Sequence, residues 1–91
     1  MLKFVTTNKF ERDYKKMQKR NKDMHKLDNV MQKLIREDVL GKRYYDHALR
    51  GNFIGRRECH IESDWLLVYK IDEEGKAIVF ERTGSHADIF E

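Results

Sequence analysis

Three histidines in the second half of the sequence lie near acidic residues that could support acid–base chemistry. His60 and Asp64 belong to the segment RRECHIESDWLLVYK at residues 56–70, His47 precedes this segment, and His86 follows the last apolar run. Histidine is the side chain best suited to moving protons near neutral pH. In a basic chain without an obvious nucleophile, this set suggests RNA cleavage.

RNA cleavage of this kind uses the 2′-hydroxyl of the RNA to attack the adjacent phosphate. A base removes the hydroxyl proton, an acid protonates the leaving 5′-oxygen, and a cation stabilises the charged phosphorane. DNA lacks the 2′-hydroxyl, so such a site would be specific for RNA. The chemistry requires no metal and no cofactor, and we predict neither. Each residue also has an ordinary alternative: His60 could be a hydrogen-bonded strand residue, and Asp64 could simply favour a turn.

A metal site is the competing interpretation of the same residues. Cys59, His47, His60 and His86 are candidate ligands. Cys59 and His60 are adjacent, so on a strand their side chains point in opposite directions. The sequence also lacks the paired CxxC or HxxxH spacing that is typical of zinc sites.

The composition sets limits on the fold and the cellular location. The chain has 91 residues, which predicts a single domain spanning residues 1–91. No apolar run approaches the ~20 residues that a membrane span requires, and the first ten residues lack the apolar core of a signal peptide. The single cysteine excludes an internal disulfide. We therefore expect a cytoplasmic protein.

Positive charge is concentrated in the first half of the chain. The formal net charge is +3, and residues 9–43 contain twelve lysines and arginines against six acidic residues. This excess favours an anionic partner such as nucleic acid. A well-solvated helical surface would produce the same pattern, so charge alone does not decide between them.

The spacing of apolar residues predicts the elements that must position the histidines. After a strand at residues 2–7, Asn8 is predicted to cap a helix with apolar positions 10, 14 and 17. Asp23 is predicted to cap a second helix with a stripe at positions 27, 30, 31, 34 and 35, and Gly41 marks its exit. Residues 42–55 are predicted to form a loop. Strands follow at residues 57–61, 65–71 and 77–83, joined by short turns. The predicted order is β-α-α-β-β-β, an α+β fold in which two N-terminal helices pack on one face of an antiparallel sheet.

The predicted hairpins bring the polar residues to one end of the sheet. Antiparallel pairing gathers His60, Asp64, Trp65, Arg82 and His86 there. If residues 62–63 form a two-residue turn, His60 lies opposite Trp65 on an open face, while residues 59, 61 and 66 face the helices. In a simple register Arg82 would also face the helices, so it is expected at the end of the sheet or beside a bulge.

Four runs of the sequence together resemble the YafQ branch of the RelE/ParE toxin superfamily. They are DHAL at residues 46–49, RECHI at 57–61, DWLLVY at 64–69 and ERTGSH at 81–86. The resemblance extends over the whole chain, and the order of elements agrees. It implies a RelE-like fold and a type II toxin, an mRNA interferase that cuts messenger RNA on the ribosome. It also implies a cognate antitoxin of the DinJ type, and the basic helices would suit contacts with ribosomal RNA.

The resemblance also assigns roles to individual residues. It associates His47, His60, Asp64 and His86 with catalysis, and Arg82 and Phe90 with phosphate contact and substrate placement. Trp65 is a further candidate for substrate binding because it lies beside Asp64. The chain departs from the family pattern at Ala48, where the family often has proline, and at Glu58, where aspartate is common.

Other functions are compatible with the same fold. A toxin of the ParE branch would bind gyrase without cleaving RNA, a plain RNA-binding module would bind without arresting growth, and a degraded toxin would only bind an antitoxin. The histidine set favours the nuclease, because a pure binder does not need it.

Overall fold

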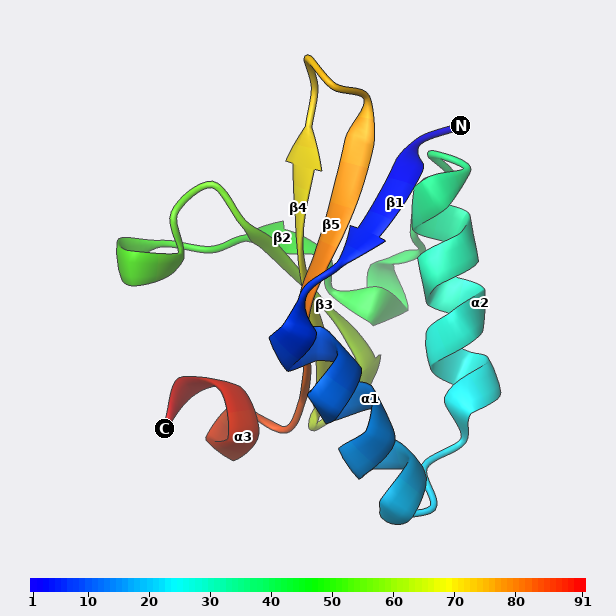
Figure 1. Ribbon diagram of the computed structural model, residues 1–91, viewed down its shortest axis with the longest axis vertical. Coiled ribbons are helices and arrows are strands. Elements are labelled where there is room, and N and C mark those ends of the chain that lie inside the picture. Colours follow the sequence, from blue (N-terminus) through cyan, green and yellow to red (C-terminus); the bar gives the residue numbers. More distant parts are fainter.

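The computed structural model describes residues 1–91 as a five-stranded sheet with two long helices on one face and a short C-terminal helix against the other face (Figure 1). The strand order is β1-β5-β4-β3-β2. The predicted α+β class and the order β-α-α-β-β-β are confirmed, with a short additional strand and a C-terminal helix. The elements are β1 (Lys3–Thr6), α1 (Asn8–Lys19), α2 (Met24–Ile35), η1 (Lys42–Tyr44), β2 (His47–Ala48), η2 (Gly51–Phe53), β3 (Arg57–Glu62), β4 (Trp65–Asp72), β5 (Ala77–Gly84) and α3 (His86–Phe90).

The sheet is mixed, because β1 pairs in parallel with β5 whereas β2, β3, β4 and β5 pair antiparallel. β1 stops at Thr6, so the end of β5 has no neighbouring strand on the side opposite β4. Helix α1 covers that edge. The Thr7 hydroxyl donates to the Glu81 carbonyl at 2.9 Å, and the Asp13 carboxylate accepts the Thr83 N–H at 3.2 Å. These side chains satisfy backbone groups that would otherwise be buried without partners.

The main core lies between the two long helices and the sheet, as the apolar stripes predict. Phe10 and Met17 of α1 and Leu27 and Val30 of α2 join the same buried cluster as Phe80 of β5. In Figure 1 both helices cover the same side of the sheet and run in opposite directions. None of the helices is long and apolar enough to span a membrane.

The helix ends differ in detail from the prediction. Thr7, and not Asn8, is the N-cap of α1, and its hydroxyl accepts the Phe10 N–H at 3.0 Å. Asp23 caps α2 as predicted. The chain leaves α2 through a left-handed residue at Glu37, with φ of 66°, before it reaches Gly41.

The predicted register of the β3–β4 hairpin was wrong. Glu62 pairs with Trp65, so the turn contains residues 63 and 64, and a bulge between His60 and Glu62 pairs His60 with Leu66. A shift of one residue exchanges the two faces of a strand. Trp65 therefore faces the helices, and Leu66 lies on the open face. Burial explains the outcome, because the large indole gains most from the larger core.

Candidate active site

The three histidines form a row on the face of the sheet that the long helices leave open. His60 projects from β3, His47 from β2, and His86 is the first residue of α3. The ring centroids of His47 and His60 are 6.5 Å apart, and those of His60 and His86 are 5.9 Å apart. The structure thus brings together the histidines that the sequence singled out, including the one in the predicted loop. Beneath this face lies a small apolar cluster of Leu66, Val68 and Ile89, with Leu49 packed against it.

His47 reaches the site because the predicted loop folds back and forms the short strand β2. His47 pairs with Glu58 of β3, and Ala48 pairs with Arg57. The preceding Asp46 anchors the segment, since its carboxylate accepts the Tyr69 hydroxyl at 2.6 Å and contacts the Arg57 guanidinium. Burial, and after it the hydrogen bond to Asp46, raises the pKa of Tyr69, so this hydroxyl remains a donor.

His86 and Asp64 form an exposed histidine–carboxylate pair. One Asp64 oxygen accepts the His86 backbone N–H at 3.0 Å and lies 2.7 Å from the ring Nδ1. The side chains are 52% and 65% exposed. The hydrogen bonds from His86, the backbone one first, lower the pKa of Asp64. With Nδ1 held by the carboxylate, Nε2 is the ring atom that can exchange a proton with a substrate.

Helix α3 places His86 through a capping box that the sequence interpretation missed. Ser85 accepts the Asp88 N–H at 3.1 Å, and the Asp88 carboxylate accepts the Ser85 N–H at 2.9 Å. A Cβ at Gly84 would lie 2.9 Å from the Cβ of Asp88, so this close approach requires glycine. The Ser85-x-x-Asp88 spacing was the available signal for this helix.

Asp88 also ties α3 to α1. Its carboxylate pairs with Arg20 at 2.7 Å and with Lys16 at 3.3 Å. Arg20 and the hydrogen bonds of the capping box hold the pKa of Asp88 well below its usual range. The helix that carries His86 is therefore fixed at both its backbone and its side chains.

His47 and Glu58 form a second pair in a more enclosed setting. His47 Nε2 lies 3.0 Å from a Glu58 oxygen, and Nδ1 lies 2.7 Å from the Tyr45 carbonyl. Glu58 is only 5% exposed, and its other carboxylate oxygen has no hydrogen-bond partner. Both ring nitrogens face acceptors, so both contacts are hydrogen bonds only when the ring carries two protons. Glu58 was not predicted as a site residue. The structure shows that it lies directly across from His47 and is the carboxylate partner of that histidine.

Aromatic rings lie beside the histidine row, Tyr45 next to His47 and His60 and Phe90 next to His86. Tyr45 is 63% exposed, and its ring centroid lies 4.5 Å from that of His47 and 5.4 Å from that of His60. Phe90 lies 6.3 Å from His86 and 5.0 Å from Phe53 of η2. Phe90 was a sequence candidate, whereas Tyr45 and Phe53 were not. The Tyr44-Tyr45 dipeptide before Asp46 was the only signal for Tyr45.

Arg82 lies beside a bulge, as expected. The register of β4 and β5 shifts between Val68 and Tyr69, and Arg82 pairs with Val68. Its guanidinium contacts the Asp13 carboxylate at 2.7 and 3.2 Å and donates to the Asp88 carbonyl at 3.2 Å. The hydrogen bond to Asp13 raises the pKa of Arg82. Arg82 therefore joins β5 to α1 and to α3, the helix that begins at His86.

Trp65 and Cys59 lie apart from the histidine row. Trp65 is 0% exposed, and its indole N–H donates to the Thr83 hydroxyl at 2.9 Å. The expectation that Trp65 touches a substrate therefore does not fit this position, because the indole offers no free surface. Cys59 is buried on the helix side, and this burial raises the pKa of its thiol.

The fold and the site together define a small basic α+β protein with histidines and carboxylates on an open sheet face. A family model described as bacterial toxin of type II toxin-antitoxin system, YafQ, matches residues 2–91. The mRNA interferase toxin YafQ of Escherichia coli strain K12 is 44% identical over 85 residues, which cover 92% of this chain and 90% of that protein. The chain therefore belongs to the YafQ family of bacterial type II toxins.

Solved structures agree with this membership. The crystal structure of YafQ from E. coli strain BL21(DE3) has a TM-score of 0.93 at 39% identity and covers 100% of both chains. YafQ in the crystal structure of the E. coli DinJ–YafQ complex has a TM-score of 0.92 at 40% identity, again over 100% of both chains. The predicted family, the RelE-like fold and the class of enzyme, an endoribonuclease, are confirmed.

Proposed function

We propose that this chain cuts messenger RNA on the translating ribosome by attack of an RNA 2′-hydroxyl, with histidines as acid and base. The observation that carries the proposal is the pair of rings, His60 and His86, 5.9 Å apart on the open face with Asp64 bound to His86. A scissile phosphate between two such rings has one group near its 2′-oxygen and another near its 5′-oxygen. The Nε2 of His86 and the ring of His60 are the groups that move protons.

The reaction proceeds in one balanced displacement. One histidine takes the proton of the 2′-hydroxyl while the oxygen forms a bond to phosphorus. The bond from phosphorus to the 5′-oxygen breaks, and the other histidine supplies the proton that this oxygen needs. The products are a 2′,3′-cyclic phosphate and a 5′-hydroxyl. None of these steps needs a metal, a cofactor or a protein nucleophile.

The surrounding residues have supporting roles in this proposal. Asp64 fixes the ring of His86 and stabilises its charged form. His47, held by the Tyr45 carbonyl and Glu58, lies beside His60 and orients the reacting phosphate, and Arg82 supplies a cation beside α3. Phe90 and Tyr45 offer ring surfaces on which unstacked bases can rest.

The partners follow from the same proposal. Messenger RNA is the substrate, and the basic helices bind ribosomal RNA phosphates. Most lysines and arginines of residues 9–43 are exposed, which suits such contacts. A DinJ-like antitoxin binds and inhibits the toxin. The crystal structure of the DinJ–YafQ complex from E. coli, which contains a relative of this chain, supports this partner. The site of action is the cytoplasm, where ribosomes translate.

The test is cleavage of a reporter messenger RNA in a purified translation system, mapped by primer extension. We expect new ends with the wild-type toxin when ribosomes translate the message, and none with naked RNA. The ends should carry a 2′,3′-cyclic phosphate and a 5′-hydroxyl. Inhibition of gyrase supercoiling without cleavage would replace the proposal by a ParE-like activity, and RNA binding without cleavage would reduce it to a binding module.

A further inference from the structure

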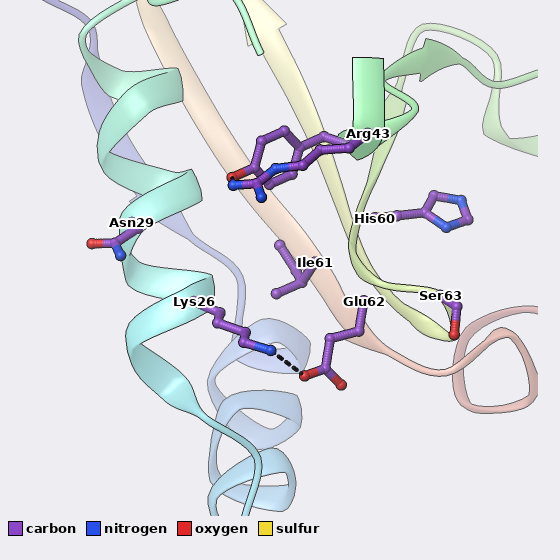
Figure 2. A pocket seen from close by; sticks show the side chains of 8 residues that line it. Lys26, Asn29, Arg43, His60, Ile61, Glu62 and Ser63 are labelled. Carbon is purple, nitrogen blue, oxygen red and sulfur yellow. Dashed lines mark hydrogen bonds and ion pairs between the residues drawn. The ribbon is translucent and has the colours of Figure 1, made fainter. Parts of the chain in front are cut away.

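A polar cleft of about 430 Å³ lies between α2 and the outer edge of β3, next to the histidine row. Lys26 and Asn29 of α2 form one wall, and Arg43 and Tyr44 of η1 form another (Figure 2). His60 also borders this cleft, although its ring points away from the lysine and toward the open face. The cleft therefore adjoins the histidine row at His60, the middle histidine.

We infer that this cleft binds the backbone phosphate of a neighbouring mRNA nucleotide and thereby positions the message for cleavage. The inference rests on the proposed function, because it names where the same RNA strand continues beyond the scissile bond.

The charges at the cleft favour an anion. The ammonium groups of Lys22 and Lys26 lie 3.2 and 3.0 Å from the two oxygens of Glu62, and Arg43 adds a third cation nearby. Two cations thus pair with Glu62, and Lys26 and Arg43 leave the lining itself with two cations against one carboxylate. The two lysines also lower the pKa of Glu62, so it stays charged and keeps both ammonium groups in place. Each ammonium has three N–H donors, so each retains donors for a phosphate oxygen.

Tyr44 holds Arg43 in position for this role. The Arg43 guanidinium lies 4.8 Å from the centre of the Tyr44 ring and donates to its hydroxyl at 2.7 Å. The Lys33 ammonium lies 5.5 Å from the same ring. An arginine stacked on a ring loses less side-chain freedom when it binds a phosphate, which favours a specific contact.

The strand edge gives the RNA a short path between the two sites. β2 pairs only with Arg57 and Glu58, so no strand pairs with the outer edge of β3 from Cys59 onward. His60 and Glu62 are two positions apart, with the bulge of β3 between them. Their side chains lie on opposite sides of β3 in Figure 2. A strand of RNA that crosses this edge would therefore pass from the histidines to the lysines.

The lining favours RNA over a protein partner. Of the eight residues that line the cleft, only two are hydrophobic. A docked peptide would need apolar anchors to bind stably, whereas a phosphate needs the charged donors that are present. An acidic segment of an antitoxin is the competing occupant, and the experiment distinguishes it.

The experiment compares Lys26→Gln and Arg43→Gln with a control, Lys3→Gln. Lys3 is an exposed lysine of β1, at the opposite edge of the sheet from β3. Cleavage is followed on mRNA-programmed ribosomes under single-turnover conditions, with toxin in excess. We expect each cleft variant to raise the half-saturating toxin concentration about fivefold, with the maximal rate and the thermal unfolding unchanged. The control should match wild type.

A second measurement identifies the phosphate. Messages are made with one neutral methylphosphonate linkage at successive positions on either side of the cut. At one linkage adjacent to the cut, the substitution should weaken wild type but add nothing to the defect of Lys26→Gln. Additive defects at every linkage would overturn the inference, because Lys26 would then contact the ribosome and not the message.

The remaining outcomes also test the assignment of the cleft to an RNA phosphate. Cleft variants that need more antitoxin for inhibition but cleave with wild-type kinetics would overturn the RNA assignment in favour of an antitoxin surface. Variants identical to wild type in every assay would overturn it outright while the nuclease proposal stands. If wild type itself cleaves no ribosome-bound message, the proposed function fails first, and the two failures are distinguishable.

Discussion

Two histidine–carboxylate pairs lie on the open face, and their surroundings differ. The His86–Asp64 pair sits where the β3–β4 turn meets α3, and both side chains are more than half exposed. The His47–Glu58 pair sits between β2 and β3, where the histidine is one-third exposed and the glutamate is buried. In the first pair one ring nitrogen remains open, whereas in the second both nitrogens face acceptors.

This difference indicates which histidine can exchange a proton in each catalytic cycle. A ring with one nitrogen held and the other open to solvent can accept and release a proton during each cycle. A ring held between a carbonyl and a buried carboxylate serves better as a fixed, hydrogen-bonded positioning group. The exposed pair should therefore carry the larger catalytic effect and the smaller effect on stability, and the buried pair the reverse.

Replacing His86 should have the largest effect on activity. We expect His86→Ala to slow single-turnover cleavage by about 10²–10⁴-fold, because it removes an acid–base group. The fold should persist, since the side chain is exposed. The measurement is primer extension over a time course, with circular dichroism as the check on folding. His25→Ala is the matched control, an exposed histidine on α2 outside the site, and should cleave like wild type. Wild-type cleavage by His86→Ala would remove the exposed pair from the mechanism.

Replacing Asp64 tests whether the pair works as a unit. Asp64→Asn keeps an oxygen that can accept the backbone N–H and the ring N–H of His86, but it removes the negative charge. We expect cleavage to slow on the order of 10–100-fold, less than for His86→Ala. The double variant should be no slower than His86→Ala alone, because the carboxylate acts through the ring. Multiplying defects in the double variant would show that Asp64 acts independently.

Replacing Glu58 should give the reverse balance. Glu58→Gln preserves the size of the side chain and removes a buried charge that has one unpaired oxygen. We expect the free energy of unfolding to fall by about 1–2 kcal/mol, more than for either variant of the exposed pair, and cleavage to slow by only about 3–10-fold. Urea unfolding and single-turnover cleavage check the two parts. A loss of cleavage as large as that of His86→Ala would give the two pairs equal roles and end the distinction.

The sequence predicted most of the fold, because local patterns determined most elements. The stripe of α2 and the turn between β4 and β5 depend on neighbouring residues, and both were located correctly. The register of β3 and β4 was wrong, because a bulge at His60 is decided by packing of the distant Trp65 into the helix-covered core. The parallel pairing of β1 likewise depends on contacts across the chain.

The site was predictable to the extent that residue type reveals chemistry. The histidines, Asp64 and Phe90 lie on one face. Residue type and topology selected the histidines and Asp64, whereas only the resemblance to the family selected Phe90. Glu58 and Tyr45 were missed because their roles come from β2, a two-residue strand that no periodicity could reveal. Asp88 looked like a tail residue, although its role follows from a capping spacing that was present in the sequence.

The smallest expected effect concerns Asp88. This residue holds α3, the helix that carries His86 of the exposed pair, and it does not contact the buried His47–Glu58 pair. We expect Asp88→Asn to slow cleavage only a few-fold, by about 2–5-fold, and to lower stability at neutral pH. The folded-state pKa of Asp88 lies below its ordinary value of 3.8. Its contribution to stability is therefore fully present above that pH and is lost progressively as the pH falls below it.

Urea unfolding of wild type and Asp88→Asn at pH 7 and at pH 3 measures this dependence. The difference in midpoint should be largest at pH 7 and should shrink at pH 3, since only wild type has this carboxylate to protonate in the unfolded chain. Asp38→Asn, in the exposed segment after α2, should differ from wild type by less than about 0.5 kcal/mol at both pH values. A constant difference for Asp88→Asn would mean that its charge does not hold α3. The exposed pair would then owe its geometry to the backbone of the capping box and to Arg82, which donates to the Asp88 carbonyl.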